Sequence, residues 1–217
     1  WGLPRLVHAL EYAASTVHDQ MPGGARLTIG DRSGHVGGKI SRHESHRTGR
    51  DVDLPWFVTT PDGVPVQNPG FVPMGPDALA STESGGFVRL DVPREWLLVK
   101  TLLTTKNIGV EWMFCSHEVE ALLIDYARAR GEPDELVFRA ETVLMQPSDS
   151  LTHNDHIHLR IACTPDEAVS GCEGGGPRWE WLPPLPELPG TEEALYREID
   201  GDPPVVTSTE QRVDPAG

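Results

Sequence analysis

Five of the nine histidines fall within residues 43–53 and 153–158. The candidate ligands in these two windows are His43, His46, Asp51, Asp53, His153, His156 and His158. A catalytic zinc site takes three protein ligands from imidazole nitrogen, cysteine sulfur and carboxylate oxygen, and it leaves a fourth position open. Because the two windows supply imidazoles and carboxylates together, the sequence predicts a metal centre built from both.

Strands are the elements that would position these groups. Asp51 and Asp53 are two residues apart in an alternating segment, as are His156 and His158, and side chains with that spacing point to one face of a strand. Two neighbouring strands would therefore direct both pairs into one pocket. Gly49 allows the chain to turn sharply before the first of these strands.

Other histidine and cysteine patterns do not predict a site. His117-Glu118 resembles the start of a zinc-binding helix, but residue 121 is alanine, so the second ligand is missing. There is no C-x-x-C pair and hence no structural zinc finger. The remaining histidines are expected to be ordinary exposed or hydrogen-bonded side chains: His8, His18, His35 and His117.

Hydrophobic periodicity and cap residues predict the other elements. Helices are expected at residues 3–20, 93–106, 116–130 and 133–145, and strands at 26–31, 51–54, 108–114 and the end of 153–161. Residues 59–86 predict a long surface excursion that could form a wall of a substrate groove. The mixed order favours an α+β fold with a small antiparallel sheet, flanked by helices, that carries the metal centre.

Composition divides the chain into a domain at 1–173 and a proline-rich, acidic tail at 174–217. The formal net charge of −15 would repel a polyphosphate backbone, so no nucleic-acid partner is expected. No segment approaches the roughly 20 apolar residues that a membrane span needs. A local basic cluster stands out against this acidity: Arg32, Lys39, Arg42, Arg47 and Arg50.

Three cysteines leave two interpretations open. Cys163 and Cys172 bracket a short loop that could close as a disulfide in an oxidising compartment, or all three could be reduced thiols. Cys115 follows an apolar run in which Trp112 and Phe114 are expected to pack in the core, with a ring that faces the substrate as the alternative.

The metal windows resemble those of known peptidases. Ser45-His46-x-x-Gly49-x-Asp51-x-Asp53 with His156-x-His158 is similar to the signature of the lysostaphin and D-Ala-D-Ala metallopeptidase group. The fuller pattern, with His43 and with His153-x-x-His156-x-His158-x-Arg160, most resembles the penicillin-insensitive murein endopeptidases. The resemblance covers residues 30–54 and 150–163.

This resemblance implies one zinc ion held by His46, Asp53 and His158. It also implies that His156 orients or stabilises the reacting water and oxyanion, and that His153 is a second catalytic candidate. His43 would be a rim residue or the ligand of a second ion. Four-coordinate zinc with a water leaves no place for Asp51, for which a hydrogen bond to His46 behind the metal is expected.

The function implied is hydrolysis of peptide cross-links in bacterial peptidoglycan, outside the cytoplasm in the periplasm or beyond. Peptidoglycan stems carry free carboxylates, so Arg42, Arg47 and Arg50 could clamp the substrate bidentately. A D-Ala-D-Ala-type carboxypeptidase or dipeptidase and a catalytically silent zinc-binding module are the alternatives. A metal-dependent nuclease is opposed by the acidic composition.

Overall fold

The computed structural model describes residues 1–41 and 43–182. In this part of the chain five helices and two four-stranded sheets form an α+β fold, as the sequence predicts. The helices are α1 (Pro4–Gln20), α2 (Val92–Thr104), α3 (His117–Ala129), α4 (Asp134–Val143) and α5 (Pro165–Val169). From residue 183 the predicted tail lies outside the described residues.

The main sheet carries the second half of each histidine window. Its strands are β1 (Asp51–Pro55), β8 (His156–Ile161), β6 (Val110–Phe114) and β7 (Leu144–Met145), in that order. β8 lies antiparallel to β1 and β6, but β7 lies parallel to β6. The expectation of an antiparallel sheet is therefore wrong at this edge. The reason is the connection: α3 and α4 return the chain before β7 begins, which is the crossover that a parallel pair requires.

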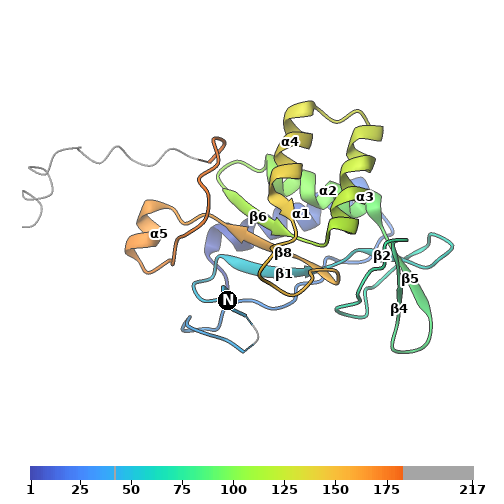
Figure 1. The fold of residues 1–217 in the computed structure, drawn as a ribbon, viewed down its shortest axis with the longest axis horizontal. Helices are drawn as coiled ribbons and strands as arrows, with labels where there is room; N and C mark the ends of the chain where they lie inside the picture. Colours follow the sequence, from blue (N-terminus) through green and yellow to red (C-terminus); the bar gives the residue numbers. More distant parts are fainter. Residues whose placement is uncertain (42, 183–217) are drawn as a thin grey trace, which may run out of the picture. The chain divides into compact units, whose positions relative to one another are not determined.

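Alternation of side chains divides this sheet into an apolar face and a polar face. The buried residues of the apolar face are Val52, Leu54, Met113, Ile157, Leu159 and Ile161. They join one hydrophobic core that also contains side chains from α1 to α4. The ribbon in Figure 1 shows these helices next to the strands of the main sheet. The residues between them along β1 and β8, including both aspartates and both histidines, are thereby directed to the opposite face.

Helix α1 agrees with the amphipathic pattern at its predicted position. Pro4 lies in the first turn, where its missing N–H costs no helical hydrogen bond. The buried residues recur at helical spacing: Leu6, Ala9, Leu10, Ala13 and Val17. The chain before α1 is joined to the first histidine window, because the Leu3 N–H donates to the Gly49 carbonyl at 2.7 Å.

Residues 59–86 differ from the expected surface excursion. They contribute to a second sheet, with the order β3 (Pro65–Val66), β2 (Val58–Thr59), β5 (Phe87–Leu90) and β4 (Leu79–Ser81). Val72 and Met74 are buried in the same core as the main sheet. Strands of two to four residues are too short to show a clear alternation, which is why the sequence pattern missed them.

The strand expected at residues 26–31 is also absent. This segment runs beside β1, with the Gly30 N–H donating to the Asp53 carbonyl at 2.8 Å and the Asp53 N–H donating to the Asp31 carbonyl at 3.0 Å. Only an isolated bridge between Arg32 and Val52 forms there. The segment therefore covers the edge of β1 without becoming a strand.

Cys163 and Cys172 form a disulfide, and Cys115 is a buried free thiol. The disulfide interpretation of the cysteines is thus the one that the structure supports. Among the described helices, none is long and apolar enough to cross a membrane.

Candidate metal centre

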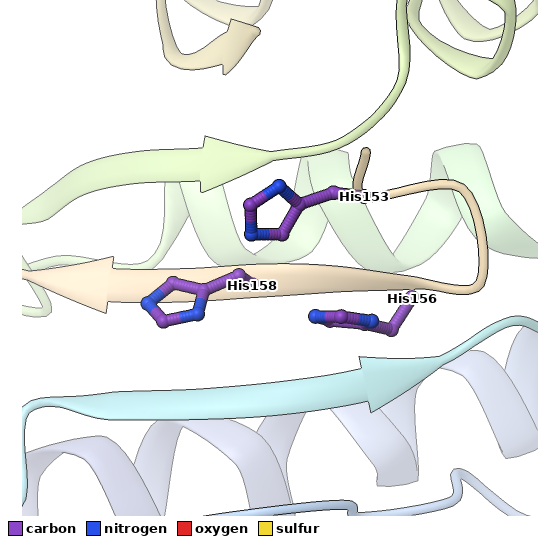
Figure 2. A group of neighbouring side chains, drawn as sticks. All are labelled: His153, His156 and His158. Carbon is purple, nitrogen blue, oxygen red and sulfur yellow. The ribbon is translucent and has the colours of Figure 1, made fainter. Parts of the chain in front are cut away.

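The register of the main sheet builds the candidate site. Asp53 on β1 pairs with His158 on β8, and His158 pairs in turn with Phe114 on β6. Directly paired residues of antiparallel strands point to the same face. Figure 2 shows His156 and His158 on β8 and His153 on the loop before it, with the His153 ring between β8 and β6 and the His156 ring between β8 and β1.

The three predicted zinc ligands converge on one point. His46 Nε2 lies 3.2 Å from Asp53 Oδ1 and 3.2 Å from His158 Nδ1, and His158 Nδ1 lies 3.1 Å from Asp53 Oδ1. Zinc–ligand bonds of about 2.0–2.2 Å in tetrahedral geometry separate neighbouring ligand atoms by about 3.3 Å. The three atoms therefore fit three corners of a zinc coordination tetrahedron.

Asp53 supplies a second observation that fits a metal. Its carboxylate is buried, and neither oxygen has a hydrogen-bond partner of normal geometry, although imidazole nitrogens surround it. Burial by itself would raise the pKa of Asp53, but the nearby His156, His158 and His46 outweigh burial and hold the pKa well below its usual range. A buried anion without hydrogen bonds calls for a cation.

His158 is held from behind by Asp51. His158 Nε2 lies 2.9 Å from Asp51 Oδ1, which also accepts a hydrogen bond from Arg160 Nε at 2.7 Å. A carboxylate on the far nitrogen of a ligating imidazole fixes the ring and its tautomer. The expected partner of Asp51 was His46, so this expectation is wrong. Asp51 pairs across the strands with Arg160, and that register places it beside His158 instead.

His156 lies beside the three converging atoms. Its Nε2 is 3.4 Å from Asp53 Oδ1, and its Nδ1 hydrogen-bonds to the neighbouring Asp155. Burial lowers the pKa of His156, but Asp155 and Asp53 outweigh burial and raise the pKa to about 9. The edge of the Phe71 ring meets the His156 ring at 5.3 Å between centroids. Phe71, from the segment 59–86, therefore contacts a histidine of the site.

His153 is fixed through its backbone. Its N–H donates to Gln146 Oε1 at 2.7 Å, and its carbonyl accepts from the Ser116 N–H at 2.7 Å. The ring lies 5.3 Å from that of His156 and 5.9 Å from that of His158. Burial, together with the charges of His156 and His158, lowers the pKa of His153 to about 4. His153 Nδ1 is buried and has no hydrogen-bond partner among the described residues.

His43 lies at the rim. Its Nε2 is 2.9 Å from Asp31 Oδ2, its Nδ1 is 3.7 Å from Asp53 Oδ2, and its ring lies 4.2 Å from that of His46. Two groups of side chains each bring ligand atoms within 4.8 Å of one another: His43, His46 and Asp53, and His153, His156 and His158.

Of the three arginines of the expected carboxylate clamp, the two that the structure describes pair with other groups. Arg50 is buried, with Nη1 on Glu111 Oε2 at 3.0 Å and Nη2 on the Gly175 carbonyl at 3.2 Å. Arg47 is partly exposed and pairs with Glu173 at 3.5 Å. Arg42 lies outside the described residues.

Aromatic residues of β6 occupy the polar face rather than the core expected for them. Trp112 and Phe114 are half-buried and stacked at 5.4 Å between centroids. Phe114 lies 5.6 Å from the His158 ring and 5.8 Å from the His153 ring. The sequence did not predict this placement, because β6 pairs with β8, a strand more than 40 residues away along the chain. Asp155, by contrast, stands directly before His156 and could have been found from that position.

A separate apolar cavity of about 220 Å³ lies on the other side of β1. It is lined by Val52 and by α1 side chains such as Leu6 and Leu10. Val52 alternates with Asp51 and Asp53, so the cavity faces away from the histidines and belongs to the helix–sheet interface.

Fold and geometry together define an α+β protein whose buried histidines and aspartate could bind a metal ion, with the two-imidazole, one-carboxylate set of catalytic zinc centres. The chain is similar to the penicillin-insensitive murein endopeptidases, a metallopeptidase family whose model matches residues 1–68. The resemblance seen in the sequence is thus confirmed. The match points to a peptidase that hydrolyses peptidoglycan.

The matched region contains the first histidine window and β1, whereas the second window lies beyond it. The geometry of the main sheet is what brings His153, His156 and His158 to the matched residues. No curated protein matches the chain.

Proposed function

We propose that this protein is a zinc-dependent murein endopeptidase that hydrolyses peptide cross-links of bacterial peptidoglycan in the periplasm or outside the cell. The observation that carries the proposal is the convergence of His46 Nε2, Asp53 Oδ1 and His158 Nδ1 at 3.1–3.2 Å from one another. The match to the murein endopeptidase family over residues 1–68 supports the substrate class.

In this proposal His46, Asp53 and His158 hold one zinc ion, and His43 with Asp31 forms the rim, where a second ion could bind. Bound zinc would lower the pKa of a water molecule to about 7 and polarise a peptide carbonyl. Asp51 keeps His158 in the tautomer that presents Nδ1 to the metal.

His153 and His156 are the proposed proton carriers. His153 has a buried Nδ1 without a partner among the described residues, so a neutral ring can accept a proton there. His156 is held on Nδ1 by Asp155 and turns Nε2 towards Asp53 Oδ1, where it can stabilise negative charge on a reacting oxygen or donate to the leaving amine.

The test combines metal content with product analysis. The purified full chain should contain one zinc per protein by elemental analysis, and mass spectrometry should show conversion of dimeric muropeptides to monomers. A chelator should abolish the conversion, and added zinc should restore it. His158→Ala should lose both zinc and activity, whereas His117→Ala, an exposed histidine, should retain both.

Each alternative has its own result. Shortening of stem peptides without separation of dimers would identify a carboxypeptidase. Stoichiometric zinc with no hydrolysis of any muropeptide would identify a silent binding module. Active protein without zinc would refute the proposed metal centre.

A further inference from the structure

Among the arginines that the structure describes, Arg160 is one whose terminal nitrogens are left for a ligand at the site. It stands two residues after His158 on β8 and pairs with Asp51 on one side and Trp112 on the other. Side chains two apart on a strand share a face, so Arg160 lies one row beyond the candidate metal ligand on the same polar face.

Two contacts hold the Arg160 guanidinium in place. Its Nε donates to Asp51 Oδ1 at 2.7 Å, and its Cζ lies 5.8 Å from the centre of the Phe114 ring. Within the part of the chain that the structure describes, no hydrogen bond involves Nη1 or Nη2. The side chain is 17% exposed. The guanidinium is therefore oriented in advance while two of its nitrogens stay available.

Arg50 and Arg47, the two described arginines of the expected clamp, do not offer this arrangement. The Nη1 and Nη2 atoms of Arg50 are occupied by Glu111 and the Gly175 carbonyl. Arg47 is more exposed than Arg160, and its Nη1 pairs with Glu173 at 3.5 Å. An anion that approached the metal along this sheet face would thus meet Arg160.

We propose that Arg160 binds the free carboxylate of the amino acid that supplies the scissile nitrogen. Two residues along a strand span about 6.4–6.8 Å. In the substrate, that carboxylate lies one residue beyond the scissile carbonyl, and one extended residue spans about 3.3–3.6 Å. A substrate with its carbonyl at the metal therefore brings the carboxylate within reach of Arg160, and planar guanidinium matches planar carboxylate.

This inference rests on the proposed function and gives it a substrate class: peptides in which the bond cleaved is followed by an uncapped carboxylate. Both a stem ending in D-Ala-D-Ala and a cross-link to a diamino acid with a free carboxylate satisfy this condition. Amidation of that carboxylate should weaken binding, because a carboxamide offers only one acceptor oxygen and no charge.

The test uses binding, so that it does not depend on turnover. The ligand is an acyl-D-Ala-D-Ala analogue in which a phosphinate replaces the scissile amide, compared with the same compound carrying a C-terminal carboxamide. Calorimetry on the zinc-loaded full chain should give at least about tenfold tighter binding of the acid, as expected when hydrogen bonds to a charged group are lost in the amide.

Arg160→Gln should remove this acid-over-amide preference, and Arg160→Lys, which keeps the charge beside Asp51, should retain part of it. Arg128→Gln is the matched control, since Arg128 is an exposed residue of α3 paired with Glu141. Zinc content is measured for every variant. A general loss of metal or of the fold would weaken the binding of the acid and of the amide equally. It would therefore not change the ratio of the two affinities.

Equal affinity of the wild type for acid and amide would overturn the inference, and so would an unchanged preference in both Arg160 variants. If dimeric muropeptides are hydrolysed but no preference is found, the proposed function stands and the role of Arg160 fails. If the preference is found without hydrolysis, the carboxylate site stands and the activity fails.

Discussion

Single residues decide how well the candidate centre can hold its metal. Asp51 does not touch the three converging ligand atoms, but it accepts hydrogen-bonding contacts from both His158 and Arg160. Removing its negative charge should free the His158 ring to rotate and should make its Nδ1 less basic. Loss of this charge should affect metal binding and not the packing of the core, because Asp51 points to the polar face of β1.

Asp51→Asn should therefore lower zinc affinity by about 10–100-fold, the usual effect of removing a carboxylate that orients a ligating histidine. Competition with a coloured chelator measures this affinity directly. Asp62→Asn, an exposed position in the turn before β3, is the control and should leave the affinity unchanged. Wild-type affinity in Asp51→Asn would show that Asp51 does not support the metal.

The proton carriers can be tested at the same scale. His153→Ala and His156→Ala should each reduce kcat by about 10²–10⁴-fold, the range for loss of general acid–base catalysis. Zinc content should stay at the wild-type value in both variants, because neither residue is a proposed ligand. Loss of zinc from His156→Ala would instead make His156 a ligand.

At the scale of elements, the turn within the first window that precedes β1 depends on Gly49. Its φ is +83°, and a Cβ at this position would lie 3.0 Å from the Leu3 nitrogen that precedes α1. Gly38 has nearly the same φ, +82°, but no atom within 4 Å of a Cβ. The two glycines therefore separate backbone strain from crowding.

Both Gly38→Ala and Gly49→Ala should lose about 1–3 kcal/mol of stability to backbone strain. Gly49→Ala should lose at least about 1 kcal/mol more, because its Cβ would also crowd Leu3. Urea unfolding of both variants measures the difference. Equal losses would show that the approach of Leu3 to Gly49 is not constrained by the missing side chain.

Helix α2 carries a buried acid in its first turn. Glu95 accepts a hydrogen bond from the Phe57 N–H at 2.9 Å, and burial raises its pKa from 4.5 to about 8. The unfolded chain loses the Glu95 proton near pH 4.5, whereas the folded protein keeps it up to about pH 8. The folded state binds the extra proton between these values, so this residue makes stability fall as the pH rises through that window.

Glu95→Gln should weaken this fall in stability between pH 5 and pH 8, by at least about 1.4 kcal/mol, the value of one pKa unit. Unfolding free energies of wild type and variant, compared at each pH, isolate the contribution of Glu95 from that of the histidines. Glu135→Gln, an exposed acid in the first turn of α4, should leave the wild-type pH dependence in place. The same result for Glu95→Gln would contradict the raised pKa.

At the scale of the whole described chain, the Cys163–Cys172 disulfide links the end of β8 to the segment after α5. The next residues reach back to the site loop and to β6: the Glu173 N–H donates to Thr48 Oγ1 at 3.3 Å, and Trp179 Nε1 donates to the Glu111 carbonyl at 2.7 Å. The disulfide thus helps to keep this segment against the main sheet.

Replacing both cysteines with serine should cost about 2–3 kcal/mol, the entropy of closing a loop of about ten residues. The melting temperature should fall by roughly 5–10 °C. A reductant should lower the wild-type melting temperature to a similar extent and should not affect the double variant. A wild type insensitive to reductant would mean that the disulfide does not stabilise the fold.

The sequence by itself determined the candidate ligands, the faces of the two key strands and most helices. These follow from local rules: period 2 directs Asp51 with Asp53 and His156 with His158, and helical spacing defines α1. The short strands within residues 59–86 escaped these rules, because their positions depend on partners far along the chain.

Tertiary structure alone decided which groups meet. The register of β1, β8 and β6 places Asp51 behind His158 instead of His46, and it places Phe114 against the histidines instead of in the core. It also gives the two arginines different partners, since Arg50 hydrogen-bonds to Glu111 and Arg160 hydrogen-bonds to Asp51 behind His158. Such pairings depend on contacts more than 40 residues apart, and no spacing within a window encodes them.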